Sequence, residues 1–212
     1  MTSPPPFDAA VIGLEPVGAT AAHLLAQQGL RVAAIDRSAE VFDKSRAIGL
    51  DQEGLRLFQG LGLAEAMAPM LGPYRPSEFR AADGSLLRRL LPRPPPDPLA
   101  WPANAMFIQP ELDALLRARL ADRPGVAVRL GDAVAGLEQG PDRVRLALRD
   151  AATGADRGAL EARWALCCDG AGSALRRLLG AEMESLDFDE PWVVVDTLLE
   201  DGRAPLPATN VQ

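Results

Sequence analysis

The sequence predicts an α/β protein in which a parallel sheet carries an additional antiparallel β element. Three observations favour this class. The chain opens with an apolar strand, a glycine turn, a helix and a second apolar strand closed by an acid, which is the order of a βαβ unit. Two later segments have the spacing of β-hairpins. An apolar strand near the end of the chain is followed by a second glycine turn and a short helical pattern.

In the opening βαβ unit, residues that typically end a helix or a strand mark where the elements stop. Gly29 follows the helical pattern, where a left-handed cap favours glycine. Asp36 follows the second apolar run directly. The expected elements are a strand before the turn over 13–18, a helix over about 17–28 and a strand over 30–35.

The remaining elements follow from periodicity and from proline and glycine positions. Asp83-Gly84 between two short apolar segments predicts a hairpin, and Pro110 occupies a position typical of a helix start. A proline-dense stretch over 92–102 predicts an ordered loop or short linker. We expect a loop over 37–51, a helix over 52–70 broken near Gly60 and Gly62, strands over 78–81 and 86–89, and a helix from Pro110 to Pro124. After it we expect strands over 126–130, 133–137, 144–148, 160–164 and 165–168, a helix from about 173 to 180, and a strand over 192–199.

Composition excludes several classes of function. The net charge is −7 and there is no basic stripe, which argues against a nucleic-acid partner. No apolar run reaches the roughly 18 residues of a membrane span, and the N-terminus lacks a signal core, so we expect a cytoplasmic protein. Cys167 and Cys168 are adjacent and cannot form an ordinary staple, and His23 is the only histidine. We therefore expect no metal site and no catalytic triad, with His23 a packed or solvent-facing helix residue.

The first turn has most of a dinucleotide-binding fingerprint. In G-x-G-x-x-G, glycines allow a tight turn and close approach of the backbone to a pyrophosphate at the helix N-terminus. Here the middle glycine is Glu15, so a carboxylate occupies the loop that would cradle phosphate. The alternative is a tight strand-to-helix turn that binds no ligand. The candidate cofactor-binding residues of this turn are Gly13, Glu15, Pro16, Val17 and Gly18.

Further candidates lie where strands of an open sheet should end. Asp36 could accept hydrogen bonds from a ribose, and Arg37 follows it directly. Arg46 could answer a phosphate charge, although a solvated surface arginine is the plainer interpretation. Gln109 could present its amide at a helix start. Asp169 and Gly170 could bring a carboxylate and bare backbone to a ligand, or they could belong to a turn with Asp169 or Ser173 as helix cap.

Taken together, five stretches resemble the FAD-dependent aromatic hydroxylases, which are class A flavoprotein monooxygenases of the phenol and 3-(3-hydroxyphenyl)propionate hydroxylase type. In order and spacing these stretches span nearly the whole chain. They are 11–18 (VIGLEPVG), 46–55 (RAIGLDQEGL), 104–113 (NAMFIQPELD), 168–173 (CDGAGS) and 188–196 (FDEPWVVVD).

The resemblance implies a Rossmann-like FAD-binding domain, a parallel sheet with an antiparallel β crossover, interleaved with a partial β-sheet substrate domain. The FAD-binding domain would comprise 1–75 and 101–185, and the substrate-domain part 76–100 and 186–212. The family uses FAD, with NAD(P)H as co-substrate, to transfer oxygen from O₂ to a phenolic ring. The cofactor supplies the difficult chemistry, so no catalytic side chain of this chain is identified.

By resemblance, each candidate residue acquires a role. Gly13 and Gly18 would flank the pyrophosphate, and Asp36 would hold the adenosine ribose. Arg46 and Gln109 would match cofactor-contacting residues, with Gln109 near the ribityl chain. Asp169 and Gly170 would match an Asp-Gly motif implicated in FAD and NAD(P)H binding.

Two departures from the family leave alternatives open. Glu15 stands where the family has glycine, and we hypothesise that Glu15 caps the helix and mimics the absent anion. The chain also has about half of the family's length. It could therefore be a truncated hydroxylase, a catalytically silent remnant or binding module that no longer retains FAD, or one half of a split monooxygenase. The last of these would need a complementing C-terminal half, and a homo-oligomer is a further arrangement to consider.

Overall fold

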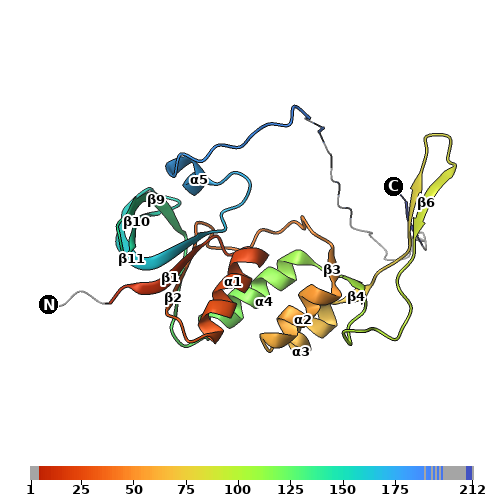
Figure 1. Ribbon diagram of the computed structural model, residues 1–212, viewed down its shortest axis with the longest axis horizontal. Coiled ribbons are helices and arrows are strands. Elements are labelled where there is room, and N and C mark those ends of the chain that lie inside the picture. The colour runs from red at the N-terminus through yellow and green to blue at the C-terminus, as the bar shows by residue number, and fades with distance from the viewer. Residues whose placement is uncertain are drawn as a thin grey trace.

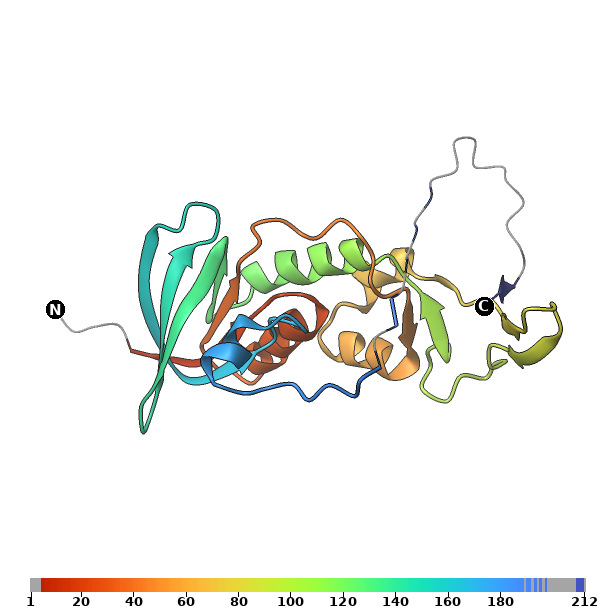
Figure 2. The same cartoon turned by 90° about the horizontal axis from the view of Figure 1, so that it is seen from above.

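A computed structural model describes residues 5–188, 190, 191, 193, 195, 197 and 209–211. A six-stranded sheet forms one end of the molecule, with strand order β8-β2-β1-β11-β10-β9 (Figure 1). Two three-stranded sheets, β3-β7-β4 and β12-β5-β6, lie towards the other end (Figures 1 and 2). The protein is therefore mixed α/β, as the sequence predicts.

The expected βαβ unit is confirmed in its elements and in its direction. Strand β1 (Phe7–Ile12) pairs in parallel with β2 (Val32–Asp36), and helix α1 (Pro16–Gln27) connects them. Strand β8 (Val126–Leu130) adds to β2, also in parallel. All five residues of β2 are buried, which is typical of a strand covered on both faces.

Helix α4 (Gln109–Ala121) packs beside α1 on one face of the sheet (Figure 2). Its leucines at 112, 116 and 120 are buried in a core cluster with Val11, Leu14 and Ala22. His23 joins the two helices: its Nε2 lies 3.0 Å from the Leu116 carbonyl oxygen, and its Nδ1 accepts from Arg123 Nε at 3.1 Å. His23 is therefore a packed, buried residue, and burial first, with the Arg123 charge as well, lowers its pKa and favours the neutral imidazole.

The antiparallel half of the same sheet is a meander that folds over the opposite face of the parallel strands. Strands β9 (Asp132–Gln139) and β10 (Val144–Asp150) pair with each other, and β10 pairs with β11 (Asp156–Cys167). A second core cluster lies between the antiparallel and parallel halves of this sheet, with Ile12, Ile35, Leu146, Leu148 and Leu160 among its members.

The prediction of separate strands over 160–164 and 165–168 is wrong, because β11 is a single strand with two partners. Its first half pairs antiparallel with β10 and its second half pairs parallel with β1, and Ala162 pairs with both strands. The end of β11 is also less buried than expected. Leu166 packs against the helix-side core, whereas Cys167 is exposed at a surface groove.

The segment between β2 and α4 builds the rest of the molecule. Strand β3 (Gly49–Asp51) forms inside the expected loop over 37–51 because β7 (Asn104–Met106) pairs with it. The helix expected over 52–70 is divided into α2 (Gln52–Gly60), α3 (Ala64–Met67) and the 3₁₀ turn η1 (Ala68–Met70). The short strand β4 (Gly72–Pro73) also pairs with β7.

The hairpin around Asp83-Gly84 is confirmed. Strands β5 (Ser77–Arg80) and β6 (Leu86–Leu90) pair antiparallel, and Gly84 has the positive φ of 84° that this turn requires. The buried Glu78 carboxylate holds Arg80 and Arg89, one from each strand. The short strand β12 (Asn210–Val211) pairs in parallel with β5. The strand expected over 192–199 falls largely outside the described residues.

Within the described ranges, none of the helices is long and apolar enough to span a bilayer.

Candidate functional site

A cleft of about 520 Å³ opens where β1, β2 and β11 end at the same edge of the sheet. Ligands of open α/β sheets bind at this edge. Six acids and three arginines contribute to the cleft wall: Glu15, Asp36, Glu40, Asp113, Asp132, Asp169, Arg37, Arg46 and Arg117.

The first turn owes its shape to two glycines that leave no room for a side chain. A Cβ on Gly13 would lie 2.4 Å from the Cys168 carbonyl oxygen, and the φ of Gly13 is +95°. A Cβ on Gly18 would lie 1.8 Å from the carbonyl oxygen of Gly13. These glycines let the turn close against α1 and against the end of β11.

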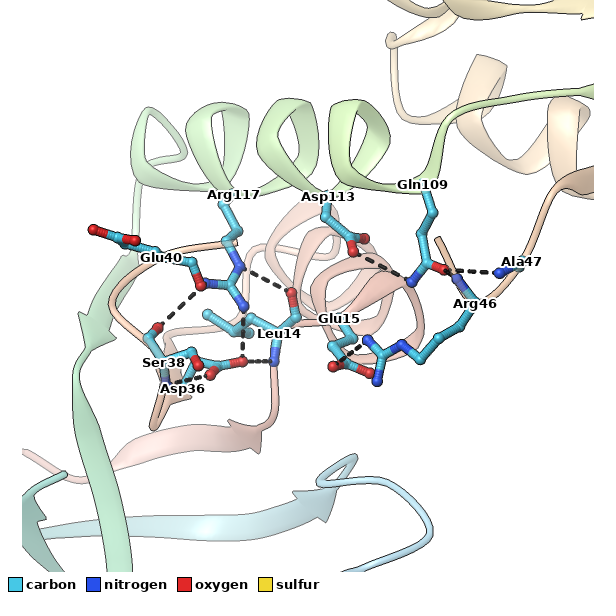
Figure 3. Close-up of polar contacts among 10 residues, drawn as sticks. All are labelled: Leu14, Glu15, Asp36, Ser38, Glu40, Arg46, Ala47, Gln109, Asp113 and Arg117. Carbon is cyan, nitrogen blue, oxygen red and sulfur yellow. Dashed lines mark hydrogen bonds and ion pairs between the residues drawn. The ribbon is translucent and has the colours of Figure 1, made fainter. Parts of the chain in front are cut away.

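The hypothesis that the Glu15 side chain caps helix α1 is wrong. Glu15 occupies the N-cap position, but its side chain makes no capping hydrogen bond. Its carboxylate instead forms an ion pair with the Arg46 guanidinium (Figure 3). Capping suits short side chains such as Ser, Asp and Asn, whose oxygen reaches back to the first-turn amides, whereas the longer Glu15 extends into the cleft.

Arg46 is placed by its backbone as well as by its side chain. The N–H groups of Arg46 and Ala47 donate to Gln109 Oε1 at 2.8 and 2.9 Å. The Arg46 guanidinium also lies over the Phe42 ring, 5.0 Å from its centroid. Gln109 is buried and is not among the described cleft-lining residues, so it positions the loop that carries Arg46.

Asp36 is held by three donors from three segments. Its Oδ2 accepts from the Leu14 N–H at 2.6 Å and from Arg117 at 3.1 Å, and its Oδ1 accepts from the Ser38 N–H at 2.7 Å. Arg117 also donates to the carbonyl oxygens of Leu14, Ser38 and Glu40, each at 3.2 Å (Figure 3). The Asp36–Arg117 ion pair is almost completely buried and joins α4 to both strand-end loops.

Asp113 occupies the same face of α4 as Gln109 and Arg117. These three residues follow one another at intervals of four, so their side chains form a polar stripe that points at the first turn (Figure 3). Asp113 is 3% exposed and Gln109 Nε2 donates to its Oδ2 over 3.4 Å, while Oδ1 has no hydrogen-bond partner among the described residues. Burial first, and then the nearby Glu15 charge, raises the pKa of Asp113 from 3.8 to about 6.

This pKa predicts the effect of Asp113→Asn on stability. Because the folded pKa lies above the unfolded value, the free energy of unfolding should fall as pH rises from about 4 through about 6. The amide removes this loss. We expect Asp113→Asn to increase the free energy of unfolding at pH 8 by up to about 3 kcal/mol, with little change at pH 4. Urea unfolding at both pH values measures this difference, and an equal effect at pH 4 and pH 8 would contradict it.

Asp169 and Gly170 lie in the turn after β11, beside the cleft. Asp169 accepts from the Ser173 hydroxyl at 2.6 Å and from the Leu175 N–H at 3.2 Å. Ser173 is the N-cap of α5 (Ala174–Leu178) and accepts from the Arg176 N–H at 2.9 Å. This helix is shorter than expected. Of the two predicted caps, Ser173 holds that position and Asp169 supports it from the cleft wall.

The structure thus brings most of the predicted residues to one place. Gly13, Glu15, Asp36, Arg37, Arg46, Asp169 and Gly170 all line the cleft, whereas Pro16, Val17 and Gly18 form the start of α1 behind it. Sequence reasoning missed Asp113 and Arg117. Their signal was present, since polar residues at 109, 113 and 117 accompany the leucines at 112, 116 and 120.

Comparison with known proteins agrees with this geometry. The family described as "FAD binding domain" matches residues 7–210. The chain belongs to this FAD-binding domain family. Its match covers the glycine turn, the Asp36–Arg117 cluster and the Asp169-Gly170 turn alike.

Relatives of this FAD-binding domain protein include hydroxylases. It is 38% identical over 189 residues to a 3-(3-hydroxy-phenyl)propionate/3-hydroxycinnamic acid hydroxylase of Mycobacterium sp. (strain JLS), covering 89% of this chain and 32% of the relative. It is 33% identical over 187 residues to the protein of the same name from Escherichia coli O139:H28, covering 88% and 33%. The chain spans about a third of the length of these curated relatives, not the half expected from the sequence.

Solved structures with the same fold include flavin enzymes. The flavin-dependent monooxygenase PieE, in complex with FAD and substrate, superimposes with a TM-score of 0.71 at 22% identity, covering 84% of this chain and 33% of PieE. The rebeccamycin biosynthetic enzyme RebC with reduced flavin gives a TM-score of 0.70 at 26% identity, covering 84% and 35%. The resemblance to flavin monooxygenases drawn from the sequence motifs is therefore confirmed.

Proposed function

We propose that the chain provides the FAD-binding part of an NAD(P)H-dependent hydroxylase that acts on phenolic rings with O₂. One observation carries the proposal: the glycine turn, Asp36, Arg46 and the Asp169-Gly170 turn, which are far apart in the sequence, border a single cleft. The hydroxylase names of the curated relatives support the reaction class. We assign 1–75 and 101–185 to the FAD-binding domain, and 76–100 with 186–212 to the part that contributes to a substrate domain.

Several features of the cleft fit FAD. Asp36 Oδ1 accepts only one described hydrogen bond, so it can also accept from a ribose hydroxyl. Arg37 and Arg46 both line the cleft and could approach phosphate oxygens. Asp113 Oδ1, which has no hydrogen-bond partner among the described residues, also fits a ligand that would supply a polar neighbour.

The Glu15 carboxylate opposes FAD binding unless Arg46 exchanges it for a phosphate. Glu15 places a carboxylate at the N-terminus of α1, where the pyrophosphate should lie, and it already holds Arg46. Both side chains are about half exposed, and such a pair contributes about 0–1 kcal/mol. Arg46 can therefore exchange Glu15 for a phosphate at little cost. With that exchange, the residues present fit the cofactor.

Bound FAD would supply the redox chemistry, and the residues of this chain would bind and orient it. Asp36 would fix the ribose, with Arg117 holding the Asp36 carboxylate and the first turn in register. Gln109 would act through the Arg46 loop instead of touching the cofactor, a change from the contact that the resemblance implies. Asp169 would hold the second turn in shape next to the cofactor.

The second candidate function is a binding module that no longer retains flavin. The Glu15–Arg46 ion pair favours this candidate, because it fills the position of the pyrophosphate with groups of the protein itself.

Titration of the purified chain with FAD distinguishes the two candidates. We expect flavin fluorescence to be quenched on binding, and the quenching to saturate, so that a dissociation constant can be fitted. The reaction is then tested by measuring NADH or NADPH oxidation in the presence of a 3-hydroxyphenyl acid. The measurement is made with and without the co-expressed C-terminal portion of a curated relative. Absence of FAD binding by both the wild type and Glu15→Gly would reject the proposal and favour the flavin-free module.

A further inference from the structure

Asp113 is a buried acid with an unsatisfied oxygen on the wall of the FAD cleft. It is 3% exposed, its Oδ1 has no hydrogen-bond partner in the described part of the chain, and its single contact to Gln109 is long at 3.4 Å. A buried carboxylate in this condition loses its hydration without replacement. The geometry alone therefore favours the neutral form of Asp113 more than water would.

Among the described residues, the charges around Asp113 leave it without a cation of its own. Glu15 faces it from the start of α1, Arg46 from the loop before β3, and Arg117 and Gln109 from α4 (Figure 3). Arg46 is paired with Glu15, and Arg117 is paired with Asp36. Three carboxyl groups thus share two guanidinium groups, and Asp113 is the unpaired member.

A pyrophosphate in this cleft would alter that balance further. It carries negative charge and competes with Glu15 for Arg46. Each change makes ionised Asp113 less favourable, because like charges in a partly dehydrated cleft repel more strongly than in water.

We propose that Asp113 takes up a proton when FAD binds, and that its neutral carboxyl is a positioning residue of the FAD site. This inference rests on the proposed FAD binding. Neutral Asp113 keeps its contact with Gln109, which holds the backbone of the Arg46 loop. Gln109 thus connects Asp113 to the loop whose guanidinium would meet the phosphate.

The coupling between proton uptake and FAD binding sets the direction in which FAD affinity changes with pH. The pKa of Asp113 in the free protein is about 6, so Asp113 is largely ionised at pH 7.5 and must gain a proton on binding. FAD affinity should then fall as pH rises above 6, by up to about tenfold per pH unit for one proton. Below pH 6 the affinity should depend little on the state of Asp113.

Isothermal titration calorimetry of the full chain with FAD counts the protons. At pH 7.5, measurements in phosphate and in Tris, whose heats of ionisation differ, should give uptake approaching about one proton per FAD for the wild type. The exposed acid Glu111 on the same helix provides the control, and Glu111→Gln should retain this uptake. Asp113→Asn should bind FAD with uptake near zero and with a dissociation constant that stays flat between pH 6 and 8.

The possible outcomes separate this inference from the proposed function. FAD binding by the wild type without proton uptake, or equal uptake by the wild type and Asp113→Asn, would overturn the inference and leave the function standing. No FAD binding by the wild type or by Glu15→Gly at any pH would overturn both. Should Asp113→Asn fail to fold, the wild-type buffer comparison decides alone, and equal apparent binding heats in phosphate and Tris would refute the inference.

Discussion

Arg117→Met is expected to lower the free energy of unfolding by about 3–5 kcal/mol, the range found when one partner of a buried ion pair is removed. The Arg117 side chain is 9% exposed, and its guanidinium donates to Asp36 and to the carbonyl oxygens of Leu14, Ser38 and Glu40. Methionine fills much of the space but leaves the Asp36 carboxylate buried without its cation. It also releases the two loops that Arg117 joins to α4. Urea unfolding at neutral pH measures the change.

Arg119 provides a matched control, because it lies on the same helix and is exposed. Arg119→Met removes an equal charge and should alter the free energy of unfolding by less than about 0.5 kcal/mol. The double variant Arg117→Met with Asp36→Asn should recover part of the lost stability, since it no longer buries an unpaired charge. Equal effects of Arg117→Met and Arg119→Met would show that the cluster does not hold the cleft together.

Glu15→Gln and Glu15→Gly are expected to tighten FAD binding, and the glycine variant should gain more. A like charge about 4 Å from a phosphate costs about 4 kcal/mol at an effective dielectric of 20. Partial exposure and pairing with Arg46 reduce this cost, because such charges are screened. We therefore expect about a tenfold gain for Glu15→Gln and up to about 100-fold for Glu15→Gly, or about 1.4 and 2.8 kcal/mol.

The two substitutions separate charge from space. Glutamine removes the charge and frees Arg46, whereas glycine also removes the Cβ from the turn that should approach the pyrophosphate. Glu53→Gln is the control, because Glu53 is an exposed acid in the first turn of α2, outside the cleft. Fluorescence titration with FAD at fixed ionic strength gives each dissociation constant. Unchanged affinity in both Glu15 variants would mean that Glu15 does not compete with the cofactor.

Local signals predicted the elements well where those signals were strong. Gly29 follows a helix end, Pro110 lies at a helix start and Asp83-Gly84 forms a hairpin turn. The elements beside them are confirmed. Strand β3 was missed because three residues carry no periodicity and form a strand only by pairing with β7, more than 50 residues later in the sequence. The single long strand β11 was divided for a similar reason, since its two halves are specified by different partners.

The sequence predicted which residues line the cleft better than it predicted how those residues contact one another. Gly13, Asp36 and Asp169 were recognisable because each lies at the expected end of a strand, whereas Arg46 was recognisable only from the resemblance of the stretch 46–55 to the family. Asp113 and Arg117 were not, because they belong to no such motif and their role depends on which way α4 turns. The hypothesis that Glu15 caps α1 was wrong because the direction of its side chain was not predictable: its carboxylate reaches Arg46 and not the amides of its own helix.

The sequence by itself determined the α/β class, the glycine turn with its acidic strand end and the relationship to flavin monooxygenases. All three depend on residues close together in the chain or on motifs in a characteristic order. Only the tertiary structure decided where the charges of the cleft go: Glu15 to Arg46, Asp36 to Arg117, and Asp113 to neither. Those pairings join α1, α4 and the loop after β2, and ion pairs between distant segments exist only after packing has brought the segments together and removed water from between them.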